Sequence, residues 1–486
     1  MFKKLLLVVL VWFVLVGLYQ VNKSLPQDVS FKGDVHMLES SDVYFFQDRT
    51  YVDADEKRFS DQEIFDEIFR MLKDANTYIL VDMFFYSNFI GVETSSYRQL
   101  SRELTDILVQ KKLDNPDIVI QVITDPINVM YGGHVSDDFE TLRNSGIPVI
   151  VTKLEPLRDS NPLYSSLWRT AFQWFGNSDK EGYLPNPLDE SSPDLGLRTY
   201  LKMLNYKANH RKIVLTDYDR SGEVGFSTLI TSGNPHDGSS AHSNMAMRID
   251  SNIWKDVLAT ESTVAKFSGT DFIFPDETFV ERVTESLSGQ ISTQLVTEGK
   301  IEERIIEEIG KTNKDDTIDI AMFYISDRDI VKALRKADDR DVKIRMILDA
   351  NKDAFGREKN GTPNRQVAHE LVSNSGGNTE IRWCDTHGEQ CHSKLLFIKS
   401  SDRVTVMQGS ANYTKRNLGD YNLETNVVVS GPVDEEVFVE ISDFFEDQWS
   451  NEENKFYSTS YEVYEDTSLY KTIMYRIKEF TGLSRW

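Results

Sequence analysis

The chain of 486 residues is longer than one ordinary domain, and its 40% hydrophobic and 11% aromatic content is enough to build two buried cores. Its 54 basic and 78 acidic residues leave a net charge of −24. Such a surface repels nucleic acid unless a local basic groove overrides it, so the charge weighs mildly against a nucleic-acid-binding protein, although acidity alone also serves solubility.

The N-terminus carries an apolar segment from residue 5 to residue 19, directly after Lys3 and Lys4. Its fifteen residues fall short of the roughly 20 that span a bilayer, but the flanking residues extend it. The residues that follow contain no A-x-A-like cleavage site and no lipobox cysteine. We therefore expect an uncleaved membrane anchor over residues 1–24, with a cleaved signal peptide as the alternative. By the positive-inside rule, the two lysines predict a cytoplasmic N-terminus and an extracytoplasmic remainder of the chain.

The hydrophobic pattern after the anchor is that of an α/β protein. In chain order it predicts a helix at 60–73, a buried strand at 78–86, a helix at 97–113, a strand at 117–124, a helix end at 139–145 and a strand at 148–151. After residue 265 the order returns, with a helix at 300–311 and strands at 318–325 and 342–348. Asp125 and Asp349 end equivalent strands of the two series. We therefore predict two similar halves, 25–265 and 266–455, each a mixed β-sheet flanked by helices.

Two further segments stand apart from this repeat. Between residues 151 and 210 the first half carries an extra stretch with clustered aromatic residues at 164–175, which suits a membrane interface, an acyl site or packing on the domain. The tail, 456–486, turns basic and amphipathic from residue 469, which suits either a membrane surface or docking on the domain. The two cysteines, Cys384 and Cys391, have no zinc-type spacing and fit a disulfide or two buried thiols equally well.

The strongest signal is a pair of short motifs. His210 and Lys212, and again His392 and Lys394, lie two residues apart at the start of an apolar run that reads as a buried strand. Alternation along a strand puts both side chains on one face. Each run is followed by a turn of small residues, and the polar side chains of these turns are Ser232, Asn234, Ser410 and Asn412. A histidine serves as nucleophile or general acid, and lysine and asparagine hold phosphoryl oxygens, so two copies facing one pocket fit a phosphodiester.

These motifs resemble those of the phospholipase D superfamily. His210, Lys212 and Asp217 match the pattern H-x-K-x-x-x-x-D, whereas the second copy has Lys399 where the aspartate belongs. Residues 409–412 match G-S-x-N and residues 422–424 match N-x-E, which ends at Glu424. In the first half the position of this glutamate falls on Ala246, with Asn244 nearby. In this family the aspartate is mainly structural, so the resemblance implies altered packing at Lys399 rather than lost chemistry.

The resemblance implies that the two halves pack about a pseudo-twofold axis and share one site. One histidine attacks phosphorus to form a phosphohistidine, and the other protonates the leaving alcohol and then activates water or an acceptor alcohol. Lysines and asparagines stabilise the phosphoryl oxygens without a metal or cofactor; they are Lys212, Lys394, Asn234 and Asn412. Glu424 orients one imidazole. Because its counterpart is uncharged, we expect His392 to hold its proton more tightly than His210, which makes His210 the nucleophile and His392 the initial acid.

The anchor, the acidic surface and the aromatic stretch favour a phospholipid substrate, and residues 209–212 resemble the first motif of cardiolipin synthases. The chain is thus expected to be a monomeric, membrane-bound phosphodiesterase or phosphatidyltransferase. Its partners are phospholipid and bilayer rather than nucleic acid. Two alternatives remain, a membrane-anchored nuclease and a catalytically inactive lipid-binding module. A basic groove at the two histidines would favour the nuclease, and an apolar channel towards the membrane would favour the lipid enzyme.

Overall fold

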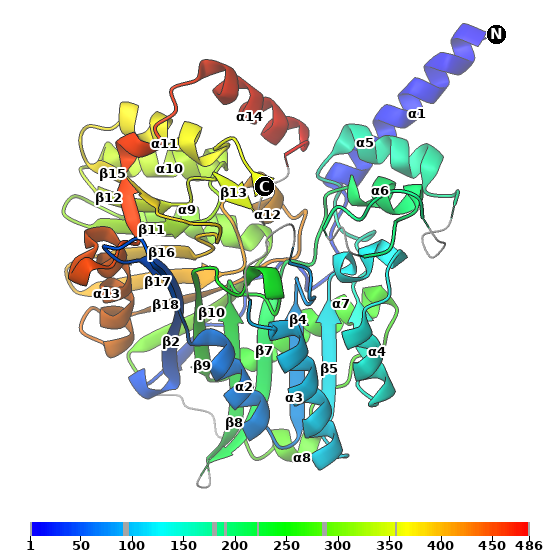
Figure 1. Ribbon diagram of the computed structural model, residues 1–486, viewed down its shortest axis with the longest axis horizontal. Helices are drawn as coiled ribbons and strands as arrows, with labels where there is room; N and C mark the ends of the chain where they lie inside the picture. The colour runs from blue at the N-terminus through cyan, green and yellow to red at the C-terminus, as the bar shows by residue number, and fades with distance from the viewer. Residues whose placement is uncertain are drawn as a thin grey trace.

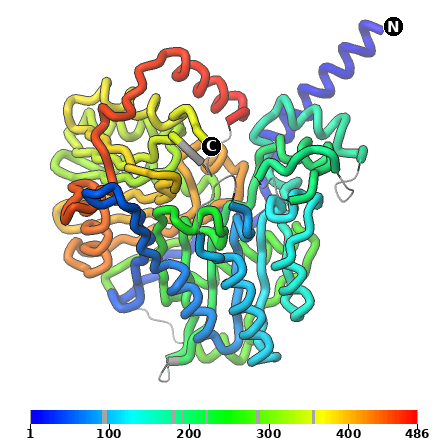
Figure 2. The backbone as a smooth tube through the Cα atoms, viewed as in Figure 1, coloured from blue at the N-terminus to red at the C-terminus, as the bar shows by residue number. Residues whose placement is uncertain are grey.

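The computed structural model describes residues 2–90, 97–176, 182–188, 192–220, 223–283, 289–354 and 357–484. Two α/β halves pack against each other, each built on a mixed sheet with helices on its faces, and an N-terminal helix projects from the body (Figure 1). Apart from residues 36–38, which pair with the second sheet, the backbone trace runs through the first half before it enters the second (Figure 2). The predicted α/β class with two flanked sheets is confirmed.

The first half is organised on a sheet of eight strands among the described residues, in the order β3-β2-β9-β8-β7-β4-β5-β6. The strands β4, β5 and β6 pair in parallel, and the other neighbours pair antiparallel. The bounds are β2 (Val43–Val52), β3 (Arg58–Gln62), β4 (Tyr78–Met83), β5 (Val119–Thr124), β6 (Val149–Val151), β7 (Lys212–Arg220), β8 (Glu223–Thr231) and β9 (Asn244–Asp250).

The second half repeats this sheet. Its order is β1-β10-β18-β17-β16-β11-β12-β15-β19, and the run from β10 to β15 follows the run from β2 to β6 strand for strand, with β11, β12 and β15 again parallel. The predicted duplication therefore extends to strand order and direction. The bounds are β1 (His36–Leu38), β10 (Ile291–Thr297), β11 (Thr317–Met322), β12 (Lys343–Leu348), β15 (Thr379–Cys384), β16 (Lys394–Lys399), β17 (Arg403–Gly409), β18 (Thr425–Pro432) and β19 (Ser458–Ser460), with a small hairpin of β13 (Asp353–Ala354) and β14 (Arg357–Glu358).

Four long helices cover each sheet in equivalent places. They are α2 (Ile64–Asp74), α3 (Leu100–Asp114), α4 (Asp137–Asn144) and α7 (Ile253–Ser268) in the first half, and α9 (Gly299–Lys311), α10 (Arg328–Asp338), α11 (Asn364–Ser373) and α13 (Glu436–Ser450) in the second. The helix predicted from residue 60 begins only at Ile64. The Asp48 carboxylate accepts the N–H groups of Glu63 and Ile64, so the preceding residues are free to pair as β3.

Three large buried clusters hold the described residues together, beside a small fourth one of Phe89, Met130 and Leu195. One lies under α2, α3 and α4, a second under α9, α10 and α11, and a third joins the two halves. In the third, the ring of Phe45 on β2 meets that of Phe444 on α13 edge to face at 5.3 Å. Near its start the described chain crosses between the halves, because β1 pairs with β10 of the second sheet. Near its end β19, in the expected tail, extends the same second sheet by pairing with β15.

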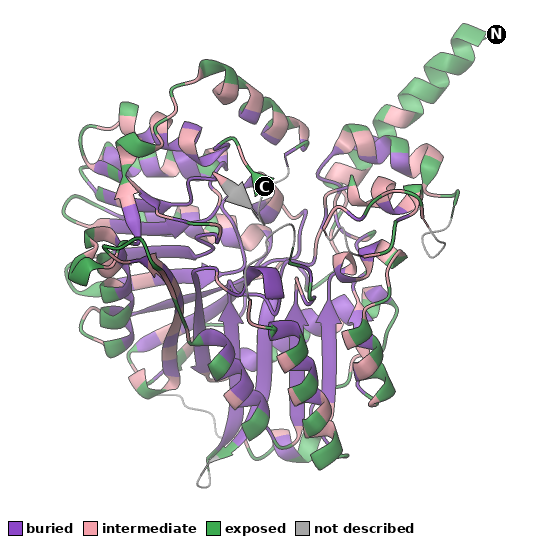
Figure 3. Cartoon of the chain, viewed as in Figure 1, coloured by how far each residue is buried: buried purple, intermediate pink, exposed green. Residues whose placement is uncertain are grey.

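The N-terminal helix α1 (Phe2–Asn22) has a mean hydropathy of 2.3 and is exposed over most of its length (Figure 3). It is the one helix in the described chain that is long and apolar enough to cross a membrane. Its last turns pack on α5 (Pro162–Leu167), where Gly17 is so close that a Cβ would lie 2.4 Å from the Ser166 hydroxyl. The remaining short helices are α6 (Leu197–Met203), α8 (Glu277–Val280), α12 (Lys415–Leu418) and α14 (Leu469–Thr481).

Candidate active site

The two motifs meet in one cavity between the halves. Lys212 and Lys394 are the first residues of the equivalent central strands β7 and β16, so His210 and His392 stand just before those strands. A cavity of about 430 Å³ is lined by both histidines and by the asparagines of both turns, Asn234 and Asn412. The sequence prediction of one shared pocket thus agrees with the arrangement of these side chains.

Backbone contacts across the junction fix each histidine against the opposite half. The His210 N–H donates to the Leu423 carbonyl at 2.8 Å, and the His392 N–H donates to the Ser243 carbonyl at 2.8 Å. Each contact belongs to a short parallel bridge, Asn209 with Leu423 and Ser243 with Cys391. The two contacts are reciprocal, as a twofold relation between the halves requires.

The imidazoles have unlike partners, and one of them differs from the sequence expectation. His210 Nδ1 lies 2.9 Å from Glu424 Oε2, and His392 Nδ1 lies 3.0 Å from Asn244 Oδ1. Glu424 therefore pairs with His210, not with His392, because the bridge at Leu423 carries the next residue across to the other half. The counterpart of Glu424 is Asn244 rather than Ala246, which is buried in β9.

The serines of the two turns hold these partners. The Ser410 hydroxyl donates to Glu424 at 2.5 Å, and the Ser232 hydroxyl donates to Asn244 Oδ1 at 3.1 Å. Both serines are fully buried, so they are directed at the partners of the imidazoles and not at a phosphate in the cavity. Glu424 also accepts hydrogen bonds from the amides of Asn417 and Asn422. Burial alone would raise the pKa of this carboxyl, but His210, Lys212 and Ser410 together hold it below its usual value.

Burial is the main influence on the charge of the two imidazoles. It lowers the pKa of His210 to about 4, against the opposing pull of Glu424. It lowers the pKa of His392 far below the usual value, with Lys394, His242 and Lys212 adding to the shift. Both imidazoles are therefore neutral near pH 7 in this structure, and an anionic phosphate between them is the kind of group that would restore their affinity for a proton.

The lysines lie behind the imidazoles. Lys212 Nζ donates to the His210 carbonyl and Lys394 Nζ to the His392 carbonyl, both at 2.6 Å, and each ammonium stands over an aromatic ring, Phe84 for Lys212 and Phe323 for Lys394. Burial lowers the pKa of Lys212 to about 7 and that of Lys394 well below its usual value. An ammonium has three donors, so each retains two for a nearby oxygen.

The amides of the two turns line the cavity and differ in the hydrogen bonding of their oxygens. Asn234 Oδ1 accepts the N–H of Phe85 at 3.1 Å, which fixes the amide so that its Nδ2 remains as a donor. Asn412 Oδ1 is buried and has no hydrogen-bond partner in the described part of the chain. Asn412 is thus a polar group in the cavity wall whose hydrogen bonding the fold does not complete.

The acid at the end of the first motif serves the fold. Asp217 lies five positions beyond Lys212 on β7, about 16 Å along an extended strand. Its carboxylate accepts the N–H groups of Asn76, Thr77 and Tyr78 at 2.8 to 3.2 Å, which fixes the start of β4. Lys399, at the equivalent end of β16, is exposed. These contacts agree with the structural role that the resemblance implied.

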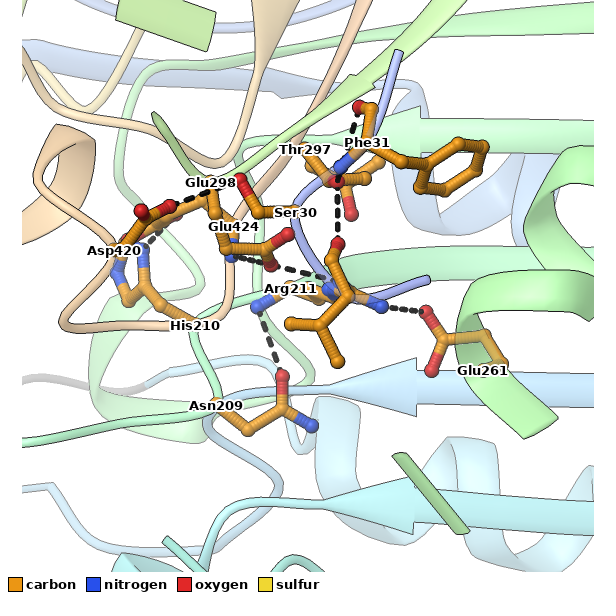
Figure 4. Close-up of polar contacts among 12 residues, drawn as sticks. Ser30, Phe31, Asn209, His210, Arg211, Glu261, Thr297, Glu298, Asp420 and Glu424 are labelled. Atoms are coloured by element: carbon orange, nitrogen blue, oxygen red, sulfur yellow. Dashed lines mark hydrogen bonds and ion pairs between the residues drawn. The ribbon is translucent and has the colours of Figure 1, made fainter. Parts of the chain in front are cut away.

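Two kinds of residue close to the histidines escaped the sequence prediction. Asp125 accepts the N–H of Asn209 at 2.6 Å, and Asp349 accepts that of Cys391 at 3.0 Å, so each braces the residue before a histidine. Their matched places at strand ends were the signal for this role. Arg211, between His210 and Lys212, is fully buried and pairs with Glu261 at 2.8 Å and Glu298 at 2.7 Å (Figure 4). Nothing in the sequence pattern pointed to this buried ion-pair cluster.

The residue before His392 is also tied covalently. Cys384, at the end of β15, forms a disulfide with Cys391. Of the two readings left open by the sequence, the structure has the disulfide. No group of three or more His, Cys, Asp or Glu side chains suited to a metal ion occurs among the described residues.

The rest of the cavity wall is largely aromatic and apolar. Phe84 and Phe85 follow β4, and Phe323 and Tyr324 occupy the equivalent place after β11. The extra stretch of the first half adds Leu188, Met203, Tyr206, Lys207 and Ala208. The cations of the wall outside the two motifs are Lys207, Lys359 and Arg416.

Comparison with known proteins agrees with this picture. Residues 305–449 match the family model described as "Cardiolipin synthase, PLD-like domain". No curated protein matches the chain by sequence.

Among solved structures, phosphatidylserine synthase of Haemophilus influenzae superposes with a TM-score of 0.56 at 9% identity over 96% of this chain and 98% of its own. Polyphosphate kinase of Porphyromonas gingivalis gives a TM-score of 0.42 at 14% identity, over 91% of this chain and 53% of its own. The phospholipase D family member Nuc of Salmonella typhimurium gives 0.28 at 18% identity, over 35% of this chain and 99% of its own. The second half of the chain thus matches the phospholipase D-like domain of cardiolipin synthases, and the whole chain shares its duplicated fold with phosphatidylserine synthase.

Proposed function

We propose that this protein cleaves or exchanges the phosphodiester of membrane phospholipids through a phosphohistidine intermediate. One observation carries the proposal. Two imidazoles face one cavity, each with Nδ1 held by a side chain of the opposite half, which leaves both Nε2 atoms for a phosphorus between them. A covalent intermediate divides a difficult displacement into two easier steps.

His210 is the nucleophile in this proposal. Its Nε2 attacks phosphorus, and the positive charge that then develops on the imidazole is stabilised by the carboxylate of Glu424 at Nδ1. The expectation that His392 holds its proton more tightly no longer supports this assignment, because the carboxylate is not beside His392. The assignment now rests on stabilisation of the phosphorylated imidazole instead.

His392 is the acid of the first step. With the anionic phosphate beside it, His392 holds a proton at Nε2 and transfers it to the leaving alcohol as the P–O bond breaks. Asn244 accepts the hydrogen bond from Nδ1 without adding charge, so the imidazolium releases its proton readily. In the second step, neutral His392 takes the proton from water or an acceptor alcohol, whose oxygen attacks phosphorus while the P–N bond to His210 breaks.

The lysines and turn asparagines stabilise the phosphoryl oxygens. Lys212 and Lys394 supply positive charge from below the imidazoles, and Asn234 and Asn412 supply amide donors from the two turns. Ser232 and Ser410 act as positioning residues, since their hydroxyls are directed at Asn244 and Glu424.

The exposed apolar side chains of helix α14 support the proposal that the substrate is a membrane lipid. The inward contacts of the helix include polar ones, because Glu479 accepts from the Ser326 hydroxyl at 2.6 Å and the Lys415 N–H at 2.8 Å. The Tyr475 side chain is buried in the core of the second half, and its hydroxyl contacts Arg328 at 3.0 Å. The apolar side chains of the helix that are exposed instead are Leu469, Tyr470, Ile473, Ile477 and Phe480. A helix that buries one tyrosine side chain and leaves five apolar side chains outward suits the surface of a bilayer.

The exposed side of α14 is continuous with the region of the N-terminal helix. Its C-terminal Gly482 is so close to Ser160 that a Cβ would lie 1.6 Å from the Ser160 carbonyl, and α5, which follows, packs on α1. Beyond α5 and the π-helical turn η3 (Trp168–Phe172), Trp174 and Phe175 are each 72% exposed. These elements project at one end of the molecule together with α1 (Figures 1 and 3).

The same observations support α1 as an anchor with the active site outside the cytoplasm. Lys3 and Lys4 give the charge bias for that orientation, and a disulfide beside His392 suits an oxidising compartment. The residues 485–486 of the expected tail lie outside the described residues.

A second candidate function has one specific observation in its favour. Aromatic rings on both sides of the cavity, with Lys359 and Arg416, would also stack and hold the bases of a single nucleic acid strand. An experiment that separates the candidates incubates the purified full chain with labelled phosphatidylglycerol, and separately with single-stranded DNA, in excess chelator. Lipid turnover that is lost in His392→Ala, with intact DNA, supports the proposal. Cleavage of DNA without lipid turnover would establish the nuclease, and neither activity would indicate a lipid-binding module.

A further inference from the structure

A second cavity of about 340 Å³ adjoins the catalytic one. Tyr131 and Lys207 line both cavities, so the two spaces meet at these side chains. Lys207 lies three residues before His210. Thr152, in the wall of the second cavity, accepts a hydrogen bond from the Asn209 amide at 3.1 Å. The second cavity is therefore built against the segment that positions the proposed nucleophile.

Cations dominate the polar lining of this second cavity. They are Arg143, Lys153, Arg169, Lys202 and Lys207, and the carboxylate of the lining is Glu155. Asp159 neutralises Arg169 at 3.0 Å and Lys207 at 2.7 Å, and Glu140 pairs with Arg143 at 2.9 Å. Lys153 and Lys202 form no ion pair in the described part of the chain. Glu155 attracts Lys202 at longer range, but in a chain of net charge −24 the lining of this cavity still carries more cations than carboxylates, which is the environment that an anion requires.

This concentration of positive charge contributes to a lower pKa of neighbouring lysines. Burial, followed by repulsion from Lys207 and Arg169, lowers the pKa of Lys23 to about 8. Burial likewise lowers the pKa of Lys207 to about 8, with Arg169 contributing in the same direction. An anion in the cavity would relieve both effects.

The cavity also has an apolar lining, and it lies near the end of the N-terminal helix. Val129, Val151, Leu154 and the ring of Trp168 provide this lining. Lys23, just beyond α1, donates to the Glu155 carbonyl at 2.7 Å, and the Asp159 N–H donates to the Gln20 carbonyl at 3.1 Å. A group that enters from the region of α1 therefore meets apolar surface together with the side chains of Lys153 and Lys202, which fits an acyl chain joined to a phosphate better than a free ion.

The cavity belongs to the part of the chain that breaks the duplication. Residues 152–209 separate β6 from His210, whereas only residues 385–391 separate β15 from His392. The longer connection supplies Lys153, Trp168, Lys202 and half of the remaining lining residues, and the shorter one has no room for an equivalent. The two histidines approach the two sides of a phosphodiester in a similar way, so they alone do not distinguish the donor from the acceptor. A binding site that exists on one side only can make this distinction.

We propose that this second cavity binds the phosphate of an anionic phospholipid through Lys153 and Lys202, and that the headgroup of this lipid reaches the catalytic cavity past Tyr131 and Lys207 as the acceptor. As acceptor, its headgroup hydroxyl gives a proton to His392 while its oxygen attacks the phosphorus held on His210, and the P–N bond breaks. This role rests on the function proposed above, whereas the binding site does not.

Binding is tested on the full chain carrying His392→Ala, in phosphatidylcholine nanodiscs with a trace of phosphatidylglycerol that bears a photoactivatable acyl chain. We expect cross-links on peptides that line the second cavity. They should fall at least about tenfold in Lys153→Glu/Lys202→Glu, because two charged contacts to phosphate are lost. The control Lys314→Glu/Lys336→Glu makes the same change of charge on the exposed surface and should leave the cross-links unchanged. The variant Lys153→Gln/Lys202→Gln removes the two positive charges without reversing them and should also weaken the cross-links.

Competition separates the sources of phosphate. Unlabelled phosphatidylglycerol should suppress the cross-links, whereas inorganic phosphate and glycerophosphoglycerol at the same concentration should not. Suppression by inorganic phosphate alone would make this a site for a free anion and overturn the proposal. Cross-links that persist in both double variants would also overturn it.

The acceptor role is tested with native histidines. In Lys153→Glu/Lys202→Glu the KM for phosphatidylglycerol as acceptor should rise at least about tenfold, with hydrolysis of the donor by water unchanged. Equal loss of transfer and hydrolysis would exclude the acceptor role. A complete lack of phospholipid turnover in the unaltered chain, with cross-linking intact, would instead refute the proposed function and leave the binding site standing.

Discussion

Replacing Glu424 with glutamine removes one negative charge from beside His210 and keeps a side chain of nearly the same shape. Glu424 Oε2 lies 2.9 Å from His210 Nδ1. With the charge centres roughly 4 Å apart and an effective dielectric constant of about 20, the attraction between a carboxylate and a cationic imidazole is about 4 kcal/mol. The amide retains a hydrogen bond worth about 1 kcal/mol, so about 3 kcal/mol of stabilisation is lost, which corresponds to a rate about 100-fold lower.

The pH dependence gives the sign of the effect. Glu424 raises the pKa of His210 against the effect of burial, so its loss lowers that pKa further. The nucleophile must be neutral, and the acidic limb of kcat against pH therefore moves to lower pH in Glu424→Gln. The basic limb belongs to His392, whose partner is Asn244, and it stays where it is.

The assay combines a pH–rate profile on a phospholipid with a denaturing quench at alkaline pH, where the P–N bond of the labelled phosphoenzyme survives, and with peptide mapping by mass spectrometry. Label on His210, together with a shift of the acidic limb alone, agrees with the assignment. A shift of the basic limb alone, or label on His392 with none on His210, would refute the reasoning and reverse the two roles.

Three other perturbations follow from the site and the proposed membrane face. His210→Ala and His392→Ala should each lower turnover by about a thousandfold or more. On a substrate whose leaving group needs no acid, only His392→Ala should accumulate phosphoenzyme. Near-normal turnover in either variant would remove that histidine from the mechanism. Activity should survive excess EDTA because lysines and asparagines supply the charge stabilisation, and loss that a divalent ion restores would require a different chemistry. Ile473→Ser/Phe480→Ser should weaken binding to anionic vesicles while leaving the Tm and the hydrolysis of a soluble short-chain substrate unchanged, since these side chains are 49% and 83% exposed; unchanged vesicle binding would exclude α14 from the membrane contact.

Most of the fold was readable in the sequence because its determinants are local. Apolar runs at strand spacing and helical spacing recur in the same order in both halves, and the two H-x-K motifs mark the equivalent central strands β7 and β16. The start of α2 was misjudged because the Asp48 cap and the pairing of β3 with β2 depend on residues distant from it in sequence.

The details of the site were less predictable because they arise between the halves. Assigning Glu424 to His392 assumed that a side chain serves its own half, but the bridge between Asn209 and Leu423 carries it to His210. The environment of Arg211 has the same origin, because Glu261 and Glu298 reach it from helix α7 and from the end of β10. A motif states which residue types are present, whereas only the packing of two halves decides which of them meet.

That exchange of partners has a consequence for how such a chain arose and what it gained. In a dimer of one unfused half, symmetry would give both imidazoles the same partner, and neither copy could specialise without the other. Once two copies are joined in a single gene, each mutates alone, and a carboxylate at one position with an amide at the other becomes attainable. The pair of Glu424 and Asn244 is therefore a difference that fusion makes possible. It also means that cutting the gene between the halves would separate each histidine from the side chain that holds it.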